Sequence, residues 1–373
     1  MWREDTNMQR EIGSNFWLNP NVDYKDKAKV DIAKFGITGT DFVLLSTGRS
    51  AESCVLEAIE KRNPDIRKVA LLPPFTCETV IEPFVKHNYE IHSYSIDRKL
   101  NMSPEMLKDS LIQTNAQVVL LHRYFGFDTL EDCDAVIREF SQKGVIFIED
   151  RTQCIFSDFE DLSVDYVIGS FRKWAGMPDG SFAVCKIGLF HNKPEQYDER
   201  LEKEKLIACY LKYGYMENGW ENKPEFLYQY QKAEHVLDEQ NIIYKISPVS
   251  ESVLEKLDLG QLKRRRRANY EYIFNGLKDC DFLEILTPSL DAQSTPLYFA
   301  VILKNRVKLQ EVLREENIFA PIVWPKADIT PSICETAQEI YDRILCIPID
   351  QRYNLEDMQR ILVTIERAKE FWK

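Results

Sequence analysis

Between residues 42 and 185 the chain alternates short apolar runs with longer stretches in which apolar positions recur at helical spacing. The short runs predict strands at Phe42–Leu45, Val69–Leu72, Glu90–Tyr94, Gln117–Leu121, Val145–Glu149, Tyr166–Gly169 and Phe182–Cys185. Several of these runs are apolar throughout, which is typical of a parallel sheet with helices on both faces. The stretches between them predict helices at Ala51–Lys61, Glu78–Lys86, Pro104–Leu111 and Leu130–Gln142. This alternation predicts an α/β domain with a mostly parallel seven-stranded sheet.

The rhythm of the chain changes after residue 190. Helical patterns predict helices at Pro194–Lys212 and Lys223–Asp238, and one long helix at Ser250–Leu277. Shorter elements of mixed type are predicted at Phe282–Leu286, Leu297–Leu303, Val307–Glu315, Phe319–Val323, Arg343–Pro348 and Asn354–Lys369. We therefore expect a large α/β domain over residues 1–247, including the N-terminal segment, and a small α+β domain over residues 248–373.

Composition narrows the classes of function. With 44% hydrophobic residues, the 373-residue chain can bury a large core, which excludes a disordered protein. Its 48 basic and 60 acidic residues give a net charge of −12, which argues against a nucleic-acid partner and favours small-molecule partners. No apolar run is long enough to cross a bilayer, and we expect neither a signal peptide nor a membrane partner.

Cysteine and histidine usage gives no sign of a metal site. The 9 cysteines lack regular spacing and several have apolar neighbours, so we expect reduced, packed thiols in a cytoplasmic protein. No CxxC pair and no HExxH motif occurs, and we predict no metal ligands. The basic run Lys263–Arg267 is interpreted as a solvated face of the predicted long helix, with an anion-binding site as the alternative.

Two turns that follow predicted strands offer groups for a phosphate and for a heterocyclic nitrogen. Thr47, Gly48 and Arg49 lie where a strand ends and a helix begins, so free N–H groups and the helix dipole could attract a phosphate. An ordinary capped turn is the alternative. Asp150 ends a buried strand and Gln153 follows it, on the side of the sheet where ligands bind. Asp150 could keep a ring nitrogen protonated, or simply cap a turn.

A candidate nucleophile follows another strand. Apolar and cationic neighbours of Lys173 would lower its pKa and free the amine for Schiff-base chemistry, whereas a lysine in a surface turn is the alternative. Ser170 precedes it, Thr76 and Cys77 follow a third strand, and His122 follows a fourth. These residues lie at the carboxyl ends of strands, so we expect them on one side of the sheet. A structural role for the histidine is equally compatible with this position.

Together, a phosphate cradle, a ring partner and a lysine nucleophile indicate a pyridoxal-phosphate site. Neither a dinucleotide GxGxxG nor a P-loop GxxxxGK[ST] motif is present. The order of the features resembles the fold-type-I pyridoxal-phosphate enzymes, and more narrowly the DegT-type sugar aminotransferases. The resemblance is colinear over about residues 40–370 and rests on Ser46-Thr47-Gly48, Pro73-Pro74-Phe75-Thr76, His122–Gly126, Val145–Gln153, Ile347-Pro348-Ile349 and Asn354–Asp357.

The resemblance implies a role for each candidate residue. Lys173 would bind the cofactor covalently and carry the proton, Asp150 would pair with the ring nitrogen, and Gln153 would reach the ring hydroxyl. Thr47, Gly48 and Ser170 would bind the phosphate, and the expected cofactor-binding set is completed by Arg49, Thr76, Cys77 and His122. The implied reaction is pyridoxal-phosphate-dependent transfer of an amino group from an amino acid, expected to be glutamate, to a keto sugar, expected to be nucleotide-linked. Surface polysaccharide or secondary-metabolite biosynthesis is the implied setting.

The resemblance also implies a homodimer in which the neighbouring subunit contributes Tyr244–Ser247. The chain departs from the family at four places, one of which is the Gly-rich stretch after the lysine, here reduced to Pro178-Asp179-Gly180-Ser181. Ser170 and Lys173 are three residues apart rather than five, Cys77 replaces an aromatic residue that stacks on the cofactor, and Ile243 replaces an asparagine. Two alternatives stay open: a lyase or dehydratase on the same scaffold, and a non-catalytic homologue that binds the cofactor.

Overall fold

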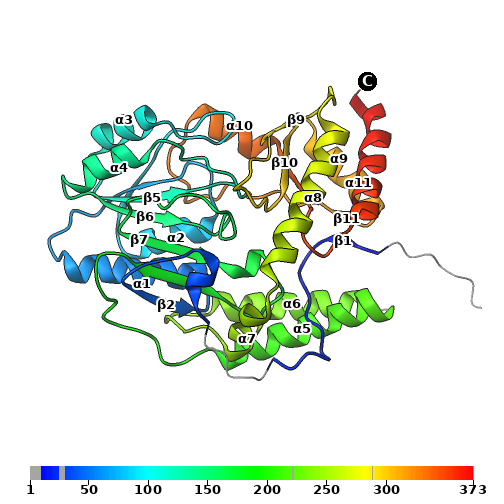
Figure 1. The fold of residues 1–373 in the computed structure, drawn as a ribbon, viewed down its shortest axis with the longest axis horizontal. Coiled ribbons are helices and arrows are strands. Elements are labelled where there is room, and N and C mark those ends of the chain that lie inside the picture. Colours follow the sequence, from blue (N-terminus) through cyan, green and yellow to red (C-terminus); the bar gives the residue numbers. More distant parts are fainter. Residues whose placement is uncertain (1–9, 25–29, 221, 288, 373) are drawn as a thin grey trace, which may run out of the picture.

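The seven predicted strands form one sheet in the computed structural model, which describes residues 10–24, 30–220, 222–287 and 289–372 (Figure 1). The strands are β2 (Asp41–Leu45), β3 (Val69–Leu72), β4 (Glu90–Ser93), β5 (Val118–His122), β6 (Ile146–Asp150), β7 (Tyr166–Ser170) and β8 (Ser181–Cys185). Their order across the sheet is β2-β8-β7-β6-β5-β3-β4. In this sheet β8 runs antiparallel to both of its neighbours, while the other pairs are parallel. The predicted α/β fold is confirmed.

Alternate residues of the strands enter two separate apolar clusters, one on each face of the sheet. On one face the strands pack with α1 (Gly48–Arg62) and α2 (Glu78–Lys86), and the strand residues there include Ala70, Leu72, Val118 and Leu120. On the other face they pack with α3 (Pro104–Thr114) and α4 (Asp134–Ser141), through residues that include Leu71, Val119, Leu121 and Phe147. Burial on both faces explains why several of these strands, such as β3, are apolar throughout.

A smaller α+β unit follows in the C-terminal part of the chain. Its antiparallel sheet has the order β12-β10-β9, formed by β9 (Glu284–Ile285), β10 (Phe299–Ile302) and β12 (Ile344–Ile347). Helices α9 (Arg306–Glu315), α10 (Glu335–Arg343) and α11 (Leu355–Ala368) complete it, and α10 was not predicted. Single 3₁₀ turns occur at η1 (Ile32–Phe35), η2 (Phe171–Lys173) and η3 (Lys369–Trp372).

The predicted long helix Ser250–Leu277 is wrong in one respect, because the structure divides it into two helices. Helix α7 (Pro248–Lys256) ends before Leu257, whose ψ of 119° is extended, and α8 (Leu259–Leu277) begins after Asp258. The Asp258 carboxylate accepts a hydrogen bond from the Gln261 amide at 2.8 Å and so caps α8. The apolar spacing continues across this break, so periodicity alone does not reveal it.

Two further elements position the N-terminal segment. Helices α5 (Glu199–Asn218) and α6 (Lys223–Asp238) form a hairpin that projects beside the sheet (Figure 1). The short strand β1 (Ile12–Gly13) pairs in parallel with β11 (Ile318–Phe319), so the start of the described chain lies against the smaller unit rather than against the large sheet. The domain boundary at residues 247/248 itself stays a prediction.

Within the described residues, no helix has the length and apolar character needed to span a membrane. All nine cysteines are free thiols, and most are buried in the apolar clusters.

Candidate active site

Most of the predicted site residues line one cavity of about 220 Å³ at the carboxyl ends of the parallel strands. Strands β2, β5, β6 and β7 end at this edge, and each delivers a predicted residue there or in the turn that follows. The predicted residues in the lining are Thr47, Gly48, Arg49, Cys77, His122, Asp150, Ser170 and Lys173. The expectation that these segments meet on one side of the sheet is therefore correct.

The start of α1 forms one end of the cavity. Thr47 is its N-cap and accepts a hydrogen bond from the Ser50 amide at 3.0 Å, so the first turn is held open toward the cavity. Ser181 Oγ on β8 donates to the Thr47 carbonyl at 2.6 Å and fixes the turn to the sheet. The helix N-terminus and Ser170 both line the cavity, and free N–H groups at a helix N-terminus generally favour an anion.

The Arg49 guanidinium is held by two carboxylates of the protein and is not free to bind an anionic ligand. It forms ion pairs with Glu82 at 3.2 Å and with Asp238 at 3.0 Å, which join α1 to α2 and α6. These hydrogen bonds and charges raise the pKa of Arg49 although burial alone would lower it. Arg49 can therefore contribute its backbone N–H to a ligand, while its side chain anchors the walls of the cavity.

Asp150 and His122 form a buried pair at the bottom of the cavity. They are register partners on neighbouring strands, and His122 Nδ1 lies 3.3 Å from Asp150 Oδ2. Burial alone would raise the pKa of Asp150, but His122 and the hydrogen bond from the Thr152 amide (2.8 Å) lower it overall. Asp150 is thus an ionised carboxylate in a buried site, as a partner of a protonated ring nitrogen must be.

Lys173 follows β7 by a single 3₁₀ turn, Phe171–Lys173. Side chains three residues apart in a 3₁₀ helix point the same way, which explains why Ser170 and Lys173 line one cavity despite their short spacing. Loss of hydration, followed by the positive charge of Arg172, lowers the pKa of Lys173, as expected from the sequence. Lys205, which is paired with Glu234, adds to this effect.

Two predicted residues lie outside the lining of the cavity. Gln153 is buried, and its Oε1 atom accepts a hydrogen bond from the Phe125 amide at 2.7 Å. The backbone N–H and carbonyl of Thr76 both bond to the hydroxyl of Tyr341 at 2.9 Å, which fixes the loop after β3. Both residues support neighbouring backbone in this structure, and their predicted contacts with a cofactor stay predictions.

Sequence reasoning missed several groups in the cavity. Trp324, from the smaller unit, lines it, and its ring meets that of His122 edge-on with centroids 5.7 Å apart. Glu52 on α1, and Glu234 and Asp238 on α6, also line it. Trp324 comes from a segment distant in sequence, and no local sequence pattern indicates that it lines the cavity. Glu52 has the polar type expected of a solvent-facing helix position, so only the fold reveals its direction.

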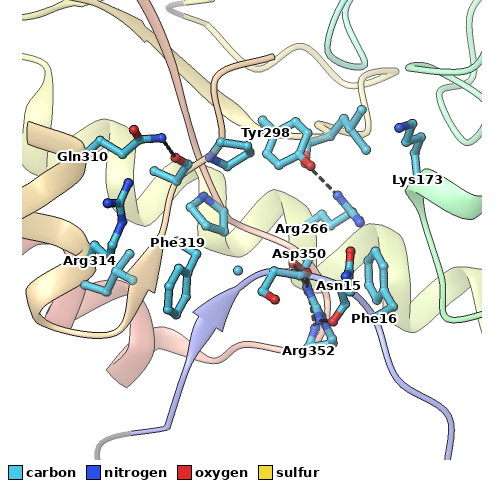
Figure 2. Close-up of a pocket in the computed structure, with 17 residues that line it drawn as sticks. Asn15, Phe16, Lys173, Arg266, Tyr298, Gln310, Arg314, Phe319, Asp350 and Arg352 are labelled. Atoms are coloured by element: carbon cyan, nitrogen blue, oxygen red, sulfur yellow. Dashed lines mark hydrogen bonds and ion pairs between the residues drawn. The ribbon is translucent and has the colours of Figure 1, made fainter. Parts of the chain in front are cut away.

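A second cavity, of about 360 Å³, opens on the other side of Lys173 (Figure 2). Asn15 and Phe16 of the N-terminal segment form one wall, and Arg314, Gln310 and Phe319 of the smaller unit form another. Figure 2 shows Lys173 across the cavity from Arg314. No hydrogen bond or ion pair holds the Arg314 side chain among the described residues, which leaves this guanidinium available to an anionic ligand.

The basic run Lys263–Arg267 is not simply a solvated helical face. Arg266 is 1% exposed, donates to the carbonyls of Pro296 and Leu297 at 3.2 and 2.9 Å, and stacks on the Trp174 ring at 4.6 Å. Burial lowers the pKa of Arg266 to about 10. Arg266 lines the second cavity, but its Nε also donates to Gln351 Oε1 at 2.8 Å, so its side chain joins α8 to neighbouring segments.

The segment that the resemblance assigns to a neighbouring subunit lies along β2 of its own chain. The Ser46 amide donates to the Tyr244 carbonyl at 3.0 Å, and the Ile246 amide donates to the Leu44 carbonyl at 3.2 Å. Ser247 is bound by Asp179, whose carboxylate accepts from the Ser247 amide and hydroxyl. Tyr244–Ser247 therefore helps to position the turn at Ser46 that precedes α1.

The fold and the lysine–aspartate cavity define a protein with the architecture of the fold-type-I pyridoxal-phosphate aminotransferases. Residues 247–366 match the family model of the DegT/DnrJ/EryC1/StrS aminotransferase family. This match confirms, over the C-terminal part of the chain, the resemblance that the motifs indicate. No curated protein sequence matches the chain.

Solved structures with this fold cover nearly the whole chain. Helicobacter pylori PseC, an aminotransferase involved in the biosynthesis of pseudoaminic acid, has a TM-score of 0.67 at 13% identity over 91% of this chain and 89% of that chain. The sugar aminotransferase CalS13 from Micromonospora echinospora has a TM-score of 0.66 at 13% identity, covering 96% and 99%. E. coli GDP-4-keto-6-deoxy-D-mannose-3-dehydratase, solved with hydrated pyridoxal phosphate, has a TM-score of 0.65 at 16% identity, covering 95% and 99%.

Proposed function

We propose that this protein is a pyridoxal-phosphate-dependent aminotransferase that moves an amino group from an amino acid to a keto sugar. The observation that carries the proposal is the meeting of Lys173, Asp150 and the start of α1 around one cavity. The family match and the sugar aminotransferases among the structural relatives support the class of reaction. Glutamate as donor and a nucleotide-linked sugar as acceptor are the finer part of the proposal, as is a role in polysaccharide or secondary-metabolite biosynthesis.

The residues present fit pyridoxal phosphate. The first turn of α1 with Ser170 would hold the phosphate, and the ionised, buried Asp150 would hold the ring nitrogen. Lys173 would hold the aldehyde carbon through its amine. Trp324 also lines the cavity, so the smaller unit would supply an aromatic contact to the ring in place of the residue that Cys77 replaces.

When bound, the cofactor supplies an electron sink for charge that develops at the α-carbon of the amino acid. Asp150 would keep the ring nitrogen protonated, because an ionised carboxylate favours a positive charge on a group beside it. Lys173 would take the proton from the α-carbon of the amino acid and deliver it to C4′ of the cofactor. Its lowered pKa suits this work, because a base acts best when part of it is unprotonated at the working pH.

The second cavity would receive the substrates. It begins at Lys173 and carries the Arg314 guanidinium, suited to the carboxylate of an amino acid or the phosphates of a sugar nucleotide. We also propose a homodimer. Ile242, beside the segment on β2, is 56% exposed, which favours a contact with a second copy that would cover it. Sedimentation of a micromolar solution should give a dimer, and a monomer would contradict the proposed homodimer. A cytoplasmic location is also part of the proposal.

The test uses the purified protein loaded with pyridoxal phosphate. Its visible absorption should change on addition of glutamate, because amino transfer converts the cofactor to its amino form, and a keto sugar should restore it. Borohydride reduction followed by peptide mapping should place the pyridoxyl group on Lys173. In the variant Lys173→Ala the label should disappear, whereas Lys193→Ala, an exposed lysine paired with Asp41, should keep it.

Each outcome separates the candidate functions. Loss of the label in both variants, or a label on another lysine, would contradict the role of Lys173. A protein that binds the cofactor but responds to no amino donor would exclude an aminotransferase. A keto sugar that loses water in its presence would instead favour a dehydratase, the class of the E. coli enzyme with this fold. No reaction with either would favour a non-catalytic binding protein.

A further inference from the structure

The cofactor cavity contains a second buried carboxyl group, for which the chemistry above has no use. Glu52 lies on α1, four residues after Gly48, and its side chain lines the cavity together with Asp150. Glu52 is 3% exposed, and within the described part of the chain its Oε2 atom has no hydrogen-bond partner. A charged carboxylate is costly to bury without a partner. Its presence at this position therefore points to the neutral form.

The charges around Glu52 favour the same form. Burial, followed by the negative charge of Asp150, raises the pKa of Glu52 well above its usual value, and Cys77 and Glu82 act in the same direction. None of the cations that the structure describes lies within ion-pair distance of Glu52. Of those that line the cavity, Arg49 pairs with Glu82 and Asp238, and His122 lies beside Asp150, while Arg172 and Lys173 act on Glu234 through their charges. Burial and the surrounding charges therefore both favour a carboxylic acid over a carboxylate at Glu52.

The position of Glu52 on the helix shows where its proton can be used. Side chains of an α-helix lean toward its N-terminus, and residues four apart share a face. Glu52 consequently shares a helix face and a cavity lining with Gly48, which lies in the first turn that would bind the phosphate. A carboxylate there would repel a phosphate dianion, whereas a neutral carboxyl group has one hydroxyl hydrogen to donate. Glutamine has the same shape and also donates.

We propose that Glu52 is a cofactor-binding residue whose neutral carboxyl group donates a hydrogen bond to the phosphate of pyridoxal phosphate. This inference rests on the proposed function, because it takes the cofactor from there. No covalent bond changes: the proton stays on Glu52, and the phosphate oxygen accepts the hydrogen bond. Two consequences follow. Glu52 should distinguish a phosphorylated ligand from its unphosphorylated analogue, and ionisation of Glu52 at high pH should weaken binding of the phosphorylated one.

The test compares pyridoxamine phosphate with pyridoxamine, because neither forms a covalent bond with Lys173. Dissociation constants are measured by calorimetry for the wild type, Glu52→Gln and Glu52→Leu. Glu57→Gln serves as a control, since it removes an exposed carboxyl group from the same helix outside this cavity. Glu52→Leu should weaken pyridoxamine phosphate about tenfold or more, the usual effect of losing a hydrogen bond to a charged group. Pyridoxamine should be bound with little change, and Glu52→Gln should bind both ligands like the wild type at neutral pH.

The pH dependence gives a second comparison. The ratio of the dissociation constants of the wild type and Glu52→Gln should be constant at low pH and should rise as Glu52 ionises. Taking the ratio removes the titration of the ligand and of the other groups in the cavity, which both proteins share. The apo proteins are also compared by infrared spectroscopy. The wild type should show a carbonyl band of a protonated carboxyl group at neutral pH that Glu52→Gln lacks.

Several results would overturn the proposal. If Glu52→Leu weakened both ligands equally, the Glu52 carboxyl group would not act on the phosphate. It would then act on a part common to both ligands, as a hydrogen bond to Asp150 at the ring nitrogen would. Unchanged affinities in Glu52→Leu, or the absence of the infrared difference, would contradict a neutral donor. If the wild type failed to bind pyridoxamine phosphate at all, the proposed function would fall together with this hydrogen bond. The infrared band would then still report the protonation of Glu52, so the two failures are distinguishable.

Discussion

Replacing Glu11 with glutamine should release the N-terminal segment from α5, because this residue neutralises a buried cation. Lys212 is 0% exposed, and its Nζ lies 2.7 Å from the Glu11 carboxylate, which is itself 3% exposed. Lys212 also donates to Ser14 Oγ at 3.2 Å. Burial lowers the pKa of Lys212 even with Glu11 in place, so its charge is the costly member of the pair. Glu11→Gln leaves that charge without a counter-ion.

The expected loss is about 3–5 kcal/mol, the usual effect of removing one partner of a buried ion pair. Lys212→Met should cost less, because Glu11 keeps its contacts with Lys223 and with Tyr215. The double variant Glu11→Gln/Lys212→Met should recover part of the stability lost by Glu11→Gln, since the charge it leaves without Glu11, that of Lys223, is 37% exposed rather than buried. The control is Glu217→Gln, which breaks the exposed pair with Arg10 and should cost less than about 1 kcal/mol.

The measurements are urea denaturation followed by tryptophan fluorescence, and limited proteolysis of the N-terminal segment. The pKa of Glu11 is lowered by Lys212 against the effect of burial, so its stabilising contribution is present above the ordinary pKa and lost as the pH falls through the lowered value. The difference between wild type and Glu11→Gln should therefore shrink in acid. Because Asn15 and Phe16 line the second cavity, the KM for substrate should also rise while cofactor affinity holds. A Glu11→Gln protein with unchanged urea midpoint and unchanged cleavage pattern would refute this reasoning.

Three further predictions concern the cofactor cavity. Asp150→Asn should keep the cofactor bound but slow turnover by about a hundredfold or more, as loss of a preorganised charge does, and stopped-flow absorbance would detect it; unchanged turnover would contradict the ring-nitrogen role. The pKa of Lys173 is lowered, so in the apo protein at pH 7–8 it should undergo reductive methylation ahead of lysines such as Lys193. Peptide mass mapping would measure the two rates, and equal rates would contradict the lowered pKa. Trp324→Ala should weaken cofactor affinity by about tenfold through loss of an aromatic contact, whereas Trp324→Phe should retain most of it.

The large sheet was predictable because its strands carry a strong local signal. A run such as Val118–His122 is buried on both faces, so the chain has to be apolar throughout, and no solvent-facing residue confuses the pattern. The candidate site followed from the same logic, because parallel strands place the residues after them at one edge. Lys173 and Asp150 lie far apart in sequence, yet the order of strands suffices to bring them together.

What the sequence did not predict depends on packing between distant segments. The break between α7 and α8 interrupts a continuous apolar spacing, and the sequence indicates it only by one capping side chain, that of Asp258. Trp324 enters the cavity from the smaller unit, a placement fixed by how the two units meet. Glu52 has the polarity of a surface position, and Gln153 proves to bond to the Phe125 backbone. In each case the residue type is ordinary and only its three-dimensional neighbours are informative.

The two cavities meet at one side chain, and this has a consequence for how the protein can change over evolution. Lys173 borders both, while their other described lining residues differ: Gln310, Arg314 and Phe319 face only the second cavity, and Thr47 and Asp150 face only the first. Under the proposed function, substitutions in the second cavity would alter the acceptor that is accommodated without touching the groups proposed to hold the cofactor. Selection for a new substrate would then need to act on only one of the two cavities.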